Sequence, residues 1–315
     1  MNQQIIAHRG ASGYRPENTA IAMSLAHAQG ADWLECDVVL TRDGEVLVLH
    51  DVELDLLTDV AARFPDRARS DGRYYVIDFS LEEIRTLRSG ERRVLSTGQP
   101  AYAGRFEIPP EPQPLMTLEE FVQLVQQLNA RANRQAGLCV ELKQPLYHER
   151  AGVDLVAPTV EILTRHGFNT PEARCMLLSF EPTVLKQLRQ ERHWRGGLLQ
   201  LIGPPEWGES DCDYARLLTP EGLAEIATYA EWVGAHLPHV VALAPGVPPR
   251  STGFVEAAHA CGLNVGSYTF QHEGLSSGLA LGALLDFAFG PLDLNAVISD
   301  FPDEAVAALD RRQAG

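Results

Sequence analysis

Short apolar runs alternate with stretches of helical periodicity along most of this 315-residue chain. Nine runs stand out, at residues 4–7, 33–40, 45–49, 138–142, 175–180, 197–202, 232–235, 264–269 and 296–299. Helical patterns lie between most of them, at residues 118–129, 154–166, 183–191, 220–230 and 253–261. Repeated strand–helix units favour a parallel sheet that is covered by helices. We therefore predict an α/β fold, a TIM-like (β/α)8 barrel that forms one domain over residues 1–315.

A TIM barrel needs only eight strands, so one of the nine runs requires another place. The runs at 33–40 and 45–49 are joined by a segment containing Asp43-Gly44, and Asp-Gly is a strong signal for a two-residue hairpin turn. We expect these two runs to pair antiparallel, as an extension of the barrel. A two-residue turn would place Asp37 opposite His50, with Cβ atoms about 5 Å apart.

The segments that follow the first and third apolar runs lead to two further predictions, a helix and an insertion. After the first run, a helix is expected to begin at Asn18 or Thr19 as its N-cap and to end just before Gly30. The stretch from Val52 to about Pro114 does not follow the repeat, and it is far longer than the roughly 2–6 residues of an ordinary barrel loop. We interpret residues 52–114 as an inserted cap or lid, which starts directly after His50.

The role of this insertion has two interpretations. As a lid, it would cover the active-site mouth, with Tyr74, Tyr75 and Phe79 as apolar surface towards the pocket. Alternatively, it packs against the outside of the barrel.

Charge and composition narrow the class of partner. With 45% hydrophobic and 22% charged residues the chain is typical of a globular protein. Its formal net charge of −16 repels nucleic acid and anionic membrane surfaces. A small anionic substrate still fits, provided that cations are placed locally. The apolar stretch 275–294 contains polar and acidic residues, so no membrane span is expected.

The compartment is predicted from the cysteines and the first residues. The five cysteines are odd in number and include no CxxC pair, which favours reduced, structural thiols. Residues 1–6 are too few for a signal peptide before His8, so the chain as written is expected in the cytoplasm. A chain from which a signal peptide had been removed would instead be expected in the periplasm.

Four of the predicted strands end in residues that carry chemistry, and barrel enzymes keep their sites at these carboxyl ends. The ends read His8-Arg9-Gly10, Glu35-Cys36-Asp37, His50-Asp51 and Glu141-Leu142-Lys143. Strand side chains alternate between faces, so Glu35 shares a face with Asp37, and Glu141 with Lys143. These residues are therefore predicted to converge at one mouth of the barrel.

The converging residue types suit phosphodiester cleavage. The three carboxylates of Glu35, Asp37 and Glu141 suit a hard divalent cation such as Ca²⁺ or Mg²⁺. Two histidines, His8 and His50, can act as general base and general acid, and two cations, Arg9 and Lys143, can bind an anionic phosphate.

Plainer interpretations exist for several of these residues. A Glu-x-Asp pattern on a strand is more often a solvated face, although the neighbours of Glu35 and Asp37 are apolar. Gly10-Ala11-Ser12-Gly13 could cradle a phosphate, but a short glycine-containing turn is weak support and also fits an ordinary strand–helix loop. Asn18 is interpreted as a helix cap rather than a ligand.

The chain resembles the glycerophosphodiester phosphodiesterase family, in particular its longer bacterial, periplasmic-type members. The resemblance rests on His8-Arg9-Gly10, Pro16-Glu17-Asn18-Thr19, Glu35-x-Asp37, His50-Asp51, Glu141-x-Lys143 and Ser299-Asp300-Phe301-Pro302-Asp303. It implies a TIM-barrel hydrolase that cleaves glycerophosphodiesters, such as glycerophosphocholine or glycerophosphoethanolamine, to glycerol 3-phosphate and an alcohol.

The resemblance also implies roles for single residues. Glu35, Asp37 and Glu141 would hold one divalent metal ion, with Ca²⁺ favoured over Mg²⁺, and His8 and His50 would be the acid/base pair. Arg9 and Lys143 would contact the phosphate, and we expect Tyr268 to join them at the substrate. Departures from the family pattern at Leu178, at residues 234–238 and at Asn295-Ala296 affect the pocket wall, and thus the head group rather than the reaction class.

Two other functions compete with hydrolysis. A related barrel phosphodiesterase would act on lysophospholipids and release a cyclic phosphate, using the same metal and histidines. A barrel that only binds phosphodiesters would be expected to lack His8 or His50, and both are present.

Overall fold

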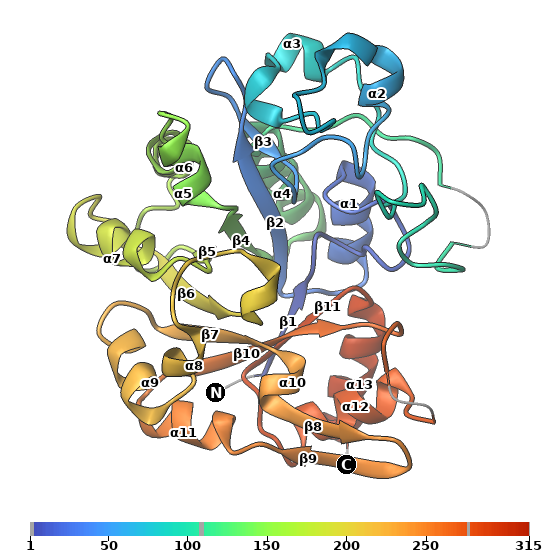
Figure 1. Cartoon of the computed structure of the whole chain (residues 1–315). Coiled ribbons are helices and arrows are strands. Elements are labelled where there is room, and N and C mark those ends of the chain that lie inside the picture. Colours follow the sequence, from blue (N-terminus) through green and yellow to red (C-terminus); the bar gives the residue numbers. More distant parts are fainter. Residues whose placement is uncertain (1–2, 107–109, 276–277, 315) are drawn as a thin grey trace.

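The computed structural model describes residues 3–106, 110–275 and 278–314 and forms a closed barrel of parallel strands with helices outside (Figure 1). Around the barrel the order is β1-β11-β10-β7-β6-β5-β4-β2, and a pairing of β1 with β2 closes it. The strands are β1 (Gln4–Ala7), β2 (Trp33–Leu40), β4 (Gly137–Leu142), β5 (Cys175–Ser179), β6 (Gly197–Ile202), β7 (Trp232–His236), β10 (Asn264–Phe270) and β11 (Ala296–Ser299). The predicted TIM-like barrel is confirmed.

The barrel strands are buried on both faces, as expected where helices cover a parallel sheet. Every residue of β2, β4, β5 and β11 is buried. The covering helices include α1 (Ala20–Ala28), α4 (Leu118–Ala132), α6 (Val156–Arg165), α7 (Pro182–Gln190), α9 (Pro220–Ile226), α11 (Phe254–Ala260), α12 (Leu281–Phe289) and α13 (Pro302–Ala314). No helix in the described part of the chain has the length and apolarity to cross a membrane.

Helix α1 follows the first strand and fixes the loop between them. Its N-cap is Thr19, whose hydroxyl accepts a hydrogen bond from the backbone of Ala22. Gly30 lies just past the end in the left-handed region, with φ of 98°. Asn18 does not cap the helix, so that interpretation is wrong. Its side-chain amide instead donates to Asp37, over 2.8 Å.

The run at residues 45–49 forms β3 (Val46–Val48), which pairs antiparallel with β2 outside the barrel. The antiparallel extension is as predicted, but the register differs by one residue because Val38 pairs with Val48. The backbone amide of Thr41 donates to the carbonyl of Glu45, and the amide of Glu45 donates to the Thr41 hydroxyl. This pairing leaves a three-residue loop with Gly44 at φ 82°. Leu49, not His50, is therefore opposite Asp37, where its amide donates to the Asp37 carbonyl.

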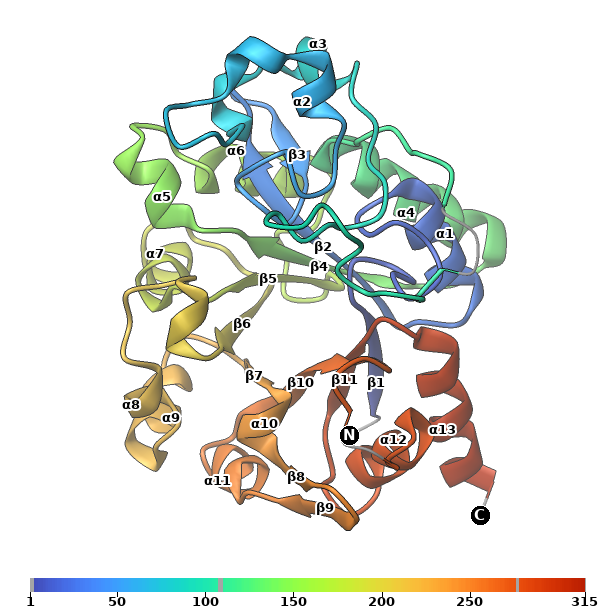
Figure 2. The ribbon, with the colours of Figure 1, turned by 45° about the vertical axis from the view of Figure 1, so that its right-hand side comes forward.

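The inserted segment lies over the hairpin of β2 and β3, above the barrel in Figures 1 and 2. It contains two short helices, α2 (Val60–Arg63) and α3 (Leu81–Ile84), with single turns η1 (Pro65–Arg67) and η2 (Val76–Asp78). Tyr74 and Phe79 are buried in a second apolar cluster with Leu47 and Leu49, and Tyr75 stacks on Tyr147. The expectation that these three aromatic residues face the substrate pocket is wrong, because they pack the insertion onto the hairpin.

The remaining short elements lie at strand ends and between the covering helices. They are α5 (Pro145–Arg150), η3 (Pro205–Trp207), α8 (Tyr214–Leu217), α10 (Leu237–Val240), β8 (Val241–Ala244) and β9 (Val247–Ser251). The hairpin of β8 and β9 follows β7 and is absent from the sequence prediction. Its exposed residues show no apolar alternation, with two prolines in β9, so the usual strand signal is missing.

The loop after β1 depends on Gly10. A Cβ atom there would lie 2.6 Å from the backbone carbon of Ala22, at the start of α1. Gly44 has nearly the same φ, 82° against 83°, yet a Cβ atom there would have no neighbour within 4 Å. A side chain at either position would therefore meet the same backbone strain, but only at Gly10 would it also collide with α1.

We expect Gly10→Ala to lower stability more than Gly44→Ala does. Both substitutions place alanine in the left-handed region, which costs roughly 1–2 kcal/mol, while only Gly10→Ala adds a collision worth about 1–3 kcal/mol. The shift of the denaturant midpoint measures both. Equal losses in the two variants would show that α1 moves aside freely, contrary to this prediction.

Candidate active site

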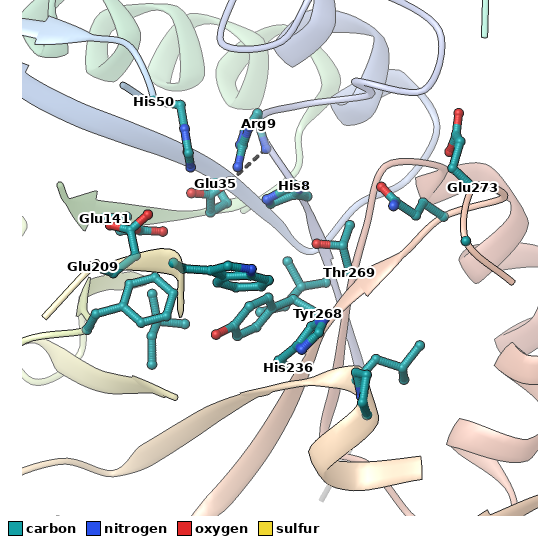
Figure 3. A pocket seen from close by; sticks show the side chains of 18 of the residues that line it. His8, Arg9, Glu35, His50, Glu141, Glu209, His236, Tyr268, Thr269 and Glu273 are labelled. Carbon is teal, nitrogen blue, oxygen red and sulfur yellow. Dashed lines mark hydrogen bonds between the residues drawn. The ribbon is translucent and has the colours of Figure 1, made fainter. Parts of the chain in front are cut away.

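A cavity of about 500 Å³ opens at the carboxyl ends of the barrel strands, and most of the predicted site residues line it (Figure 3). These are His8, Arg9, Glu35, His50, Glu141, Lys143 and Tyr268. Asp37 is the exception, because it is buried just behind the cavity wall. The structure thus brings together every residue singled out from the sequence.

Three buried carboxylates form a cluster on β2 and β4. Glu35 and Asp37 are two residues apart on β2 and share a face, and Asp37 pairs with Glu141 of β4 in the sheet register. One oxygen atom from each of the three lies within 4.8 Å of the others. Asp37 Oδ1 is buried and has no hydrogen-bond partner among the described residues. Oxygen atoms in this arrangement fit a divalent cation.

The carboxylates perturb one another, since like charges in a buried site oppose ionisation. Burial, together with Asp37 and Glu141, raises the pKa of Glu35 well above its usual value. Burial and Asp37 also raise the pKa of Glu141, to about 8, against the opposing effect of Lys143. The pKa of Asp37 is lowered despite burial, because Arg9 is close. A bound cation would relieve this repulsion.

Two side-chain cations flank the cluster. Arg9 lies with its Nε 3.2 Å from Asp37 and its NH1 2.8 Å from Glu17, and its backbone amide donates to Glu35. Lys143 lies 2.8 Å from Glu141 and 2.9 Å from Glu209. Although burial opposes it, these two glutamates raise the pKa of Lys143, which stays protonated. Both cations therefore remain charged at the cavity wall.

Each histidine is held by an aspartate. His8 Nδ1 lies 2.7 Å from Asp300, which follows β11, and His50 Nδ1 lies 2.7 Å from Asp51. The ammonium group of Lys143 lies 3.1 Å from His50 Nε2. A protonated lysine can only donate, so Nε2 of His50 accepts and its Nδ1–H donates to Asp51. This fixes His50 as a neutral tautomer, and burial lowers its pKa further.

Comparison with known proteins agrees with this geometry. The sequence model of the glycerophosphoryl diester phosphodiesterase family matches residues 8–304. A glycerophosphodiester phosphodiesterase of Haemophilus influenzae is 33% identical over 97% of this chain and 89% of its own length. The chain belongs to this family. The predicted resemblance and the predicted class of enzyme are thereby confirmed, and the cyclic-phosphate alternative is not favoured.

Solved structures share the fold of this family member. A Silicibacter pomeroyi protein superposes with a TM-score of 0.73 over 99% of this chain and 94% of its own, at 22% identity. A phosphodiesterase of Oleispira antarctica, solved in complex with the product sn-glycerol-3-phosphate, gives a TM-score of 0.62 at 24% identity, covering 98% of this chain and 96% of that one.

The turn Gly10-Ala11-Ser12-Gly13 fits the plainer of its two interpretations in this glycerophosphodiester phosphodiesterase family member. The amides of Gly10, Ala11 and Gly13 donate to the carbonyls of Ala7, Ala22 and Asp300. Gly13 is instead required for packing, because a Cβ atom there would lie 2.4 Å from the ring of Phe301. This loop is an ordinary strand–helix connection.

Sequence reasoning missed Trp207, which joins His236 and the predicted Tyr268 in an aromatic wall of the cavity. Trp207 lies 4.7 Å from His236 and 6.4 Å from Tyr268, measured between ring centroids. The hydroxyl of Tyr268 donates to the carbonyl of Ile202, so only its ring is presented to the cavity. Trp207 sits in an irregular loop after β6, where no periodic pattern marks it.

Sequence reasoning also missed the charged neighbours of the site. Glu17, Arg92, Arg105 and Glu209 all pair with predicted site residues or their aspartate partners. Glu17 stands in the Pro16-Glu17-Asn18-Thr19 motif, which was a usable signal. Arg92 and Arg105 come from the insertion, whose sequence offers no pattern that points to the site.

We predict that Glu35→Gln stabilises the metal-free protein. Glu35 has no ion pair among the described side chains, and glutamine can still accept the hydrogen bond from the Arg9 amide. The change therefore removes more repulsion, from Asp37 and Glu141, than attraction, to Arg9. A carboxyl whose pKa is raised on folding costs nothing below the unfolded value of about 4.3 and progressively more above it. In chelator, the gain in Tm should therefore grow as pH rises from about 5 to about 8, reaching about 2 °C or more.

Added Ca²⁺ should raise the Tm of the unchanged protein and have little effect on Glu35→Gln. Glu45→Gln, in the exposed turn between β2 and β3, is the matched control. It should keep both the Tm and the Ca²⁺ response of the unchanged protein. A Glu35→Gln variant that is less stable at every pH, or that responds to Ca²⁺ normally, would contradict the assignment of this carboxylate.

Proposed function

We propose that this chain hydrolyses glycerophosphodiesters to glycerol 3-phosphate and an alcohol, with a divalent metal ion and two histidines. The observation that carries the proposal is the convergence, in one cavity, of a three-carboxylate cluster with two aspartate-held histidines. Family membership supports the same reaction class. The product complex of the Oleispira antarctica relative supports glycerol 3-phosphate as the phosphate-bearing product.

Glu35, Asp37 and Glu141 would hold the metal ion, for which we favour Ca²⁺ over Mg²⁺. The donor set supports this proposal, because it is all oxygen and includes an otherwise unpartnered carboxylate atom. When bound, the ion supplies positive charge that stabilises the extra negative charge on the phosphoryl oxygens in the transition state. Arg9 and Lys143 add fixed positive charge on either side of the phosphate.

The two histidines differ in their surroundings, and this supports a division of labour. His50 presents a lone pair at Nε2 and is kept neutral by burial and by Lys143. We assign it as the general base that removes a proton from the attacking water once the phosphate engages Lys143. His8 then protonates the leaving alkoxide oxygen. The P–O bond to water forms, the P–O bond to the alcohol breaks, and the aspartates keep both rings oriented.

The alcohol head group would lie against the aromatic wall. Trp207, His236 and Tyr268 line the cavity together with Leu178, where this chain departs from the family pattern. Burial lowers the pKa of His236 to about 4, so this wall is uncharged near neutral pH. Uncharged rings accept the methylated ammonium of choline through cation–π contact. Glycerophosphocholine is therefore the head group that we favour.

The direct test is an assay on glycerophosphocholine, glycerophosphoethanolamine and glycerophosphoglycerol, with coupled detection of glycerol 3-phosphate. We expect turnover that excess chelator abolishes and Ca²⁺ restores, because the carboxylate cluster needs its cation. Phosphorus NMR of the products would show the monoester. Full activity in chelator, or a cyclic phosphate as the final product, would refute the proposal as stated.

We expect His8→Ala and His50→Ala each to lower kcat by about 10²–10⁴-fold, the usual loss on removing a general acid or base. His166→Ala is the control, since His166 pairs with Glu119 at the end of α6, outside the cavity. Circular dichroism would establish that all three variants are folded. A folded His8 or His50 variant with near-normal turnover would exclude that residue from the mechanism.

A further inference from the structure

In both histidine–aspartate pairs, the aspartate also forms an ion pair with an arginine of the inserted segment. Asp51 uses Oδ1 for His50, and its Oδ2 lies 2.8 Å from Arg92. Asp300 uses Oδ1 for His8, and its Oδ2 lies 2.8 Å from Arg105. The same His–Asp–Arg arrangement therefore occurs twice beside one cavity. Asp51 comes from the segment after β3 and Asp300 from the segment after β11.

Each arginine is itself fixed by a second carboxylate. Arg92 donates through Nε and NH2 to Glu17, over 2.9 and 2.8 Å. Arg105 donates to Glu273 in the same two-pronged way, over 2.7 and 2.6 Å, and stacks on the ring of Tyr102. A guanidinium group held in this manner has little freedom to rotate.

Simple attachment of the insertion to the barrel does not account for this pattern. Burying charges is costly, so a buried ion pair contributes little net stability, yet the side chains of Arg105 and Asp300 are only 4% and 3% exposed. Other arginines of the insertion form pairs away from the cavity, such as Arg73 with Asp55. Arg92 and Arg105 differ from these, because each meets a carboxylate that holds a histidine.

We propose that Arg92 and Arg105 are positioning residues, through which the inserted segment fixes both acid/base histidines in their working orientation. The inference rests on the proposed function, because it takes His8 and His50 as the acid/base pair. With one oxygen in an ion pair with arginine, each aspartate directs its other oxygen to histidine Nδ1. The ring is then held with Nδ1–H towards the aspartate and Nε2 towards the cavity.

The two arginines lie in the stretch between α3 and α4, in which the described residues form neither helix nor strand. Individual backbone hydrogen bonds fix it, such as those that Ala101 donates to Arg92 and that Arg93 donates to Leu56. Through the two arginines, the orientation of both acid/base histidines depends on one irregular segment. The insertion acts on the chemistry itself, beyond any covering of the pocket.

The experiment compares Arg92→Lys and Arg105→Lys with the unchanged enzyme. Lysine keeps the buried positive charge, so the variants should fold, but a single ammonium group does not reproduce the two-pronged bridge. We expect kcat to fall about 10–100-fold, as for other groups that orient a functional side chain, while KM and the Ca²⁺-induced rise in Tm change little. Arg73→Lys is the matched control from the same segment.

Two further measurements separate positioning from a merely structural role. In an Asp51→Asn background, Arg92→Lys should change kcat by less than about threefold, because both residues act through His50. In ¹⁵N-histidine NMR spectra, Arg92→Lys should perturb the His50 ring signals alone and Arg105→Lys the His8 signals alone. These signals are assigned with His8→Gln and His50→Gln.

The NMR signals also separate this inference from the proposed function, because they do not need turnover. Selective ring perturbation in a protein that cleaves no glycerophosphodiester would retain the arginine contacts and reject the proposed reaction. Unperturbed rings in both lysine variants, or equal kcat losses in Arg73→Lys, would overturn the positioning role.

Discussion

Mutual repulsion among Glu35, Asp37 and Glu141 is the constraint on which the rest of the site depends. Three acids whose oxygens approach within 4.8 Å in a buried place are unfavourable by themselves. The chain offsets this with Arg9 on one side and Lys143 on the other, and each of these cations in turn meets a further glutamate. The remaining charge imbalance is what a divalent cation would neutralise. In the proposed site, repulsion that lowers the stability of the protein without metal would be the source of its affinity for a cation.

The barrel makes this crowding possible because neighbouring strands are rigidly registered. Asp37 and Glu141 are partners in the β2–β4 ladder, and the six residue pairs of that ladder prevent the two side chains from moving apart. The histidines arrive differently, from the segments that follow β1 and β3, and need aspartates to orient them. Rigid strands therefore hold the carboxylates, while loops supply the histidines proposed as the acid/base pair. This division matches the general placement of function on barrel loops.

Much of this was readable from the sequence, for reasons that also explain the failures. All nine predicted apolar runs coincide with strands, because buried parallel strands carry continuous apolar residues that stand out from their surroundings. The β2–β3 register failed by one residue because the Thr41 hydroxyl takes a turn hydrogen bond that Asp-Gly alone does not reveal. Trp207, Arg92 and Arg105 were missed because they stand in aperiodic segments and meet the site only through tertiary contacts. Asn18 was read as a cap since its role, orienting Asp37, depends on a strand distant in sequence.

The pairing of β1 with β11 has a consequence for how the protein folds during its synthesis. His8 lies at the end of the first strand and Asp300 just after the last, and their contact spans 292 positions of the chain. Translation proceeds from β1 to β11, so the nascent polypeptide carries His8 without Asp300 until the strands between them have been made. The barrel seam and the contact that orients His8 are therefore completed by the same event, the addition of β11.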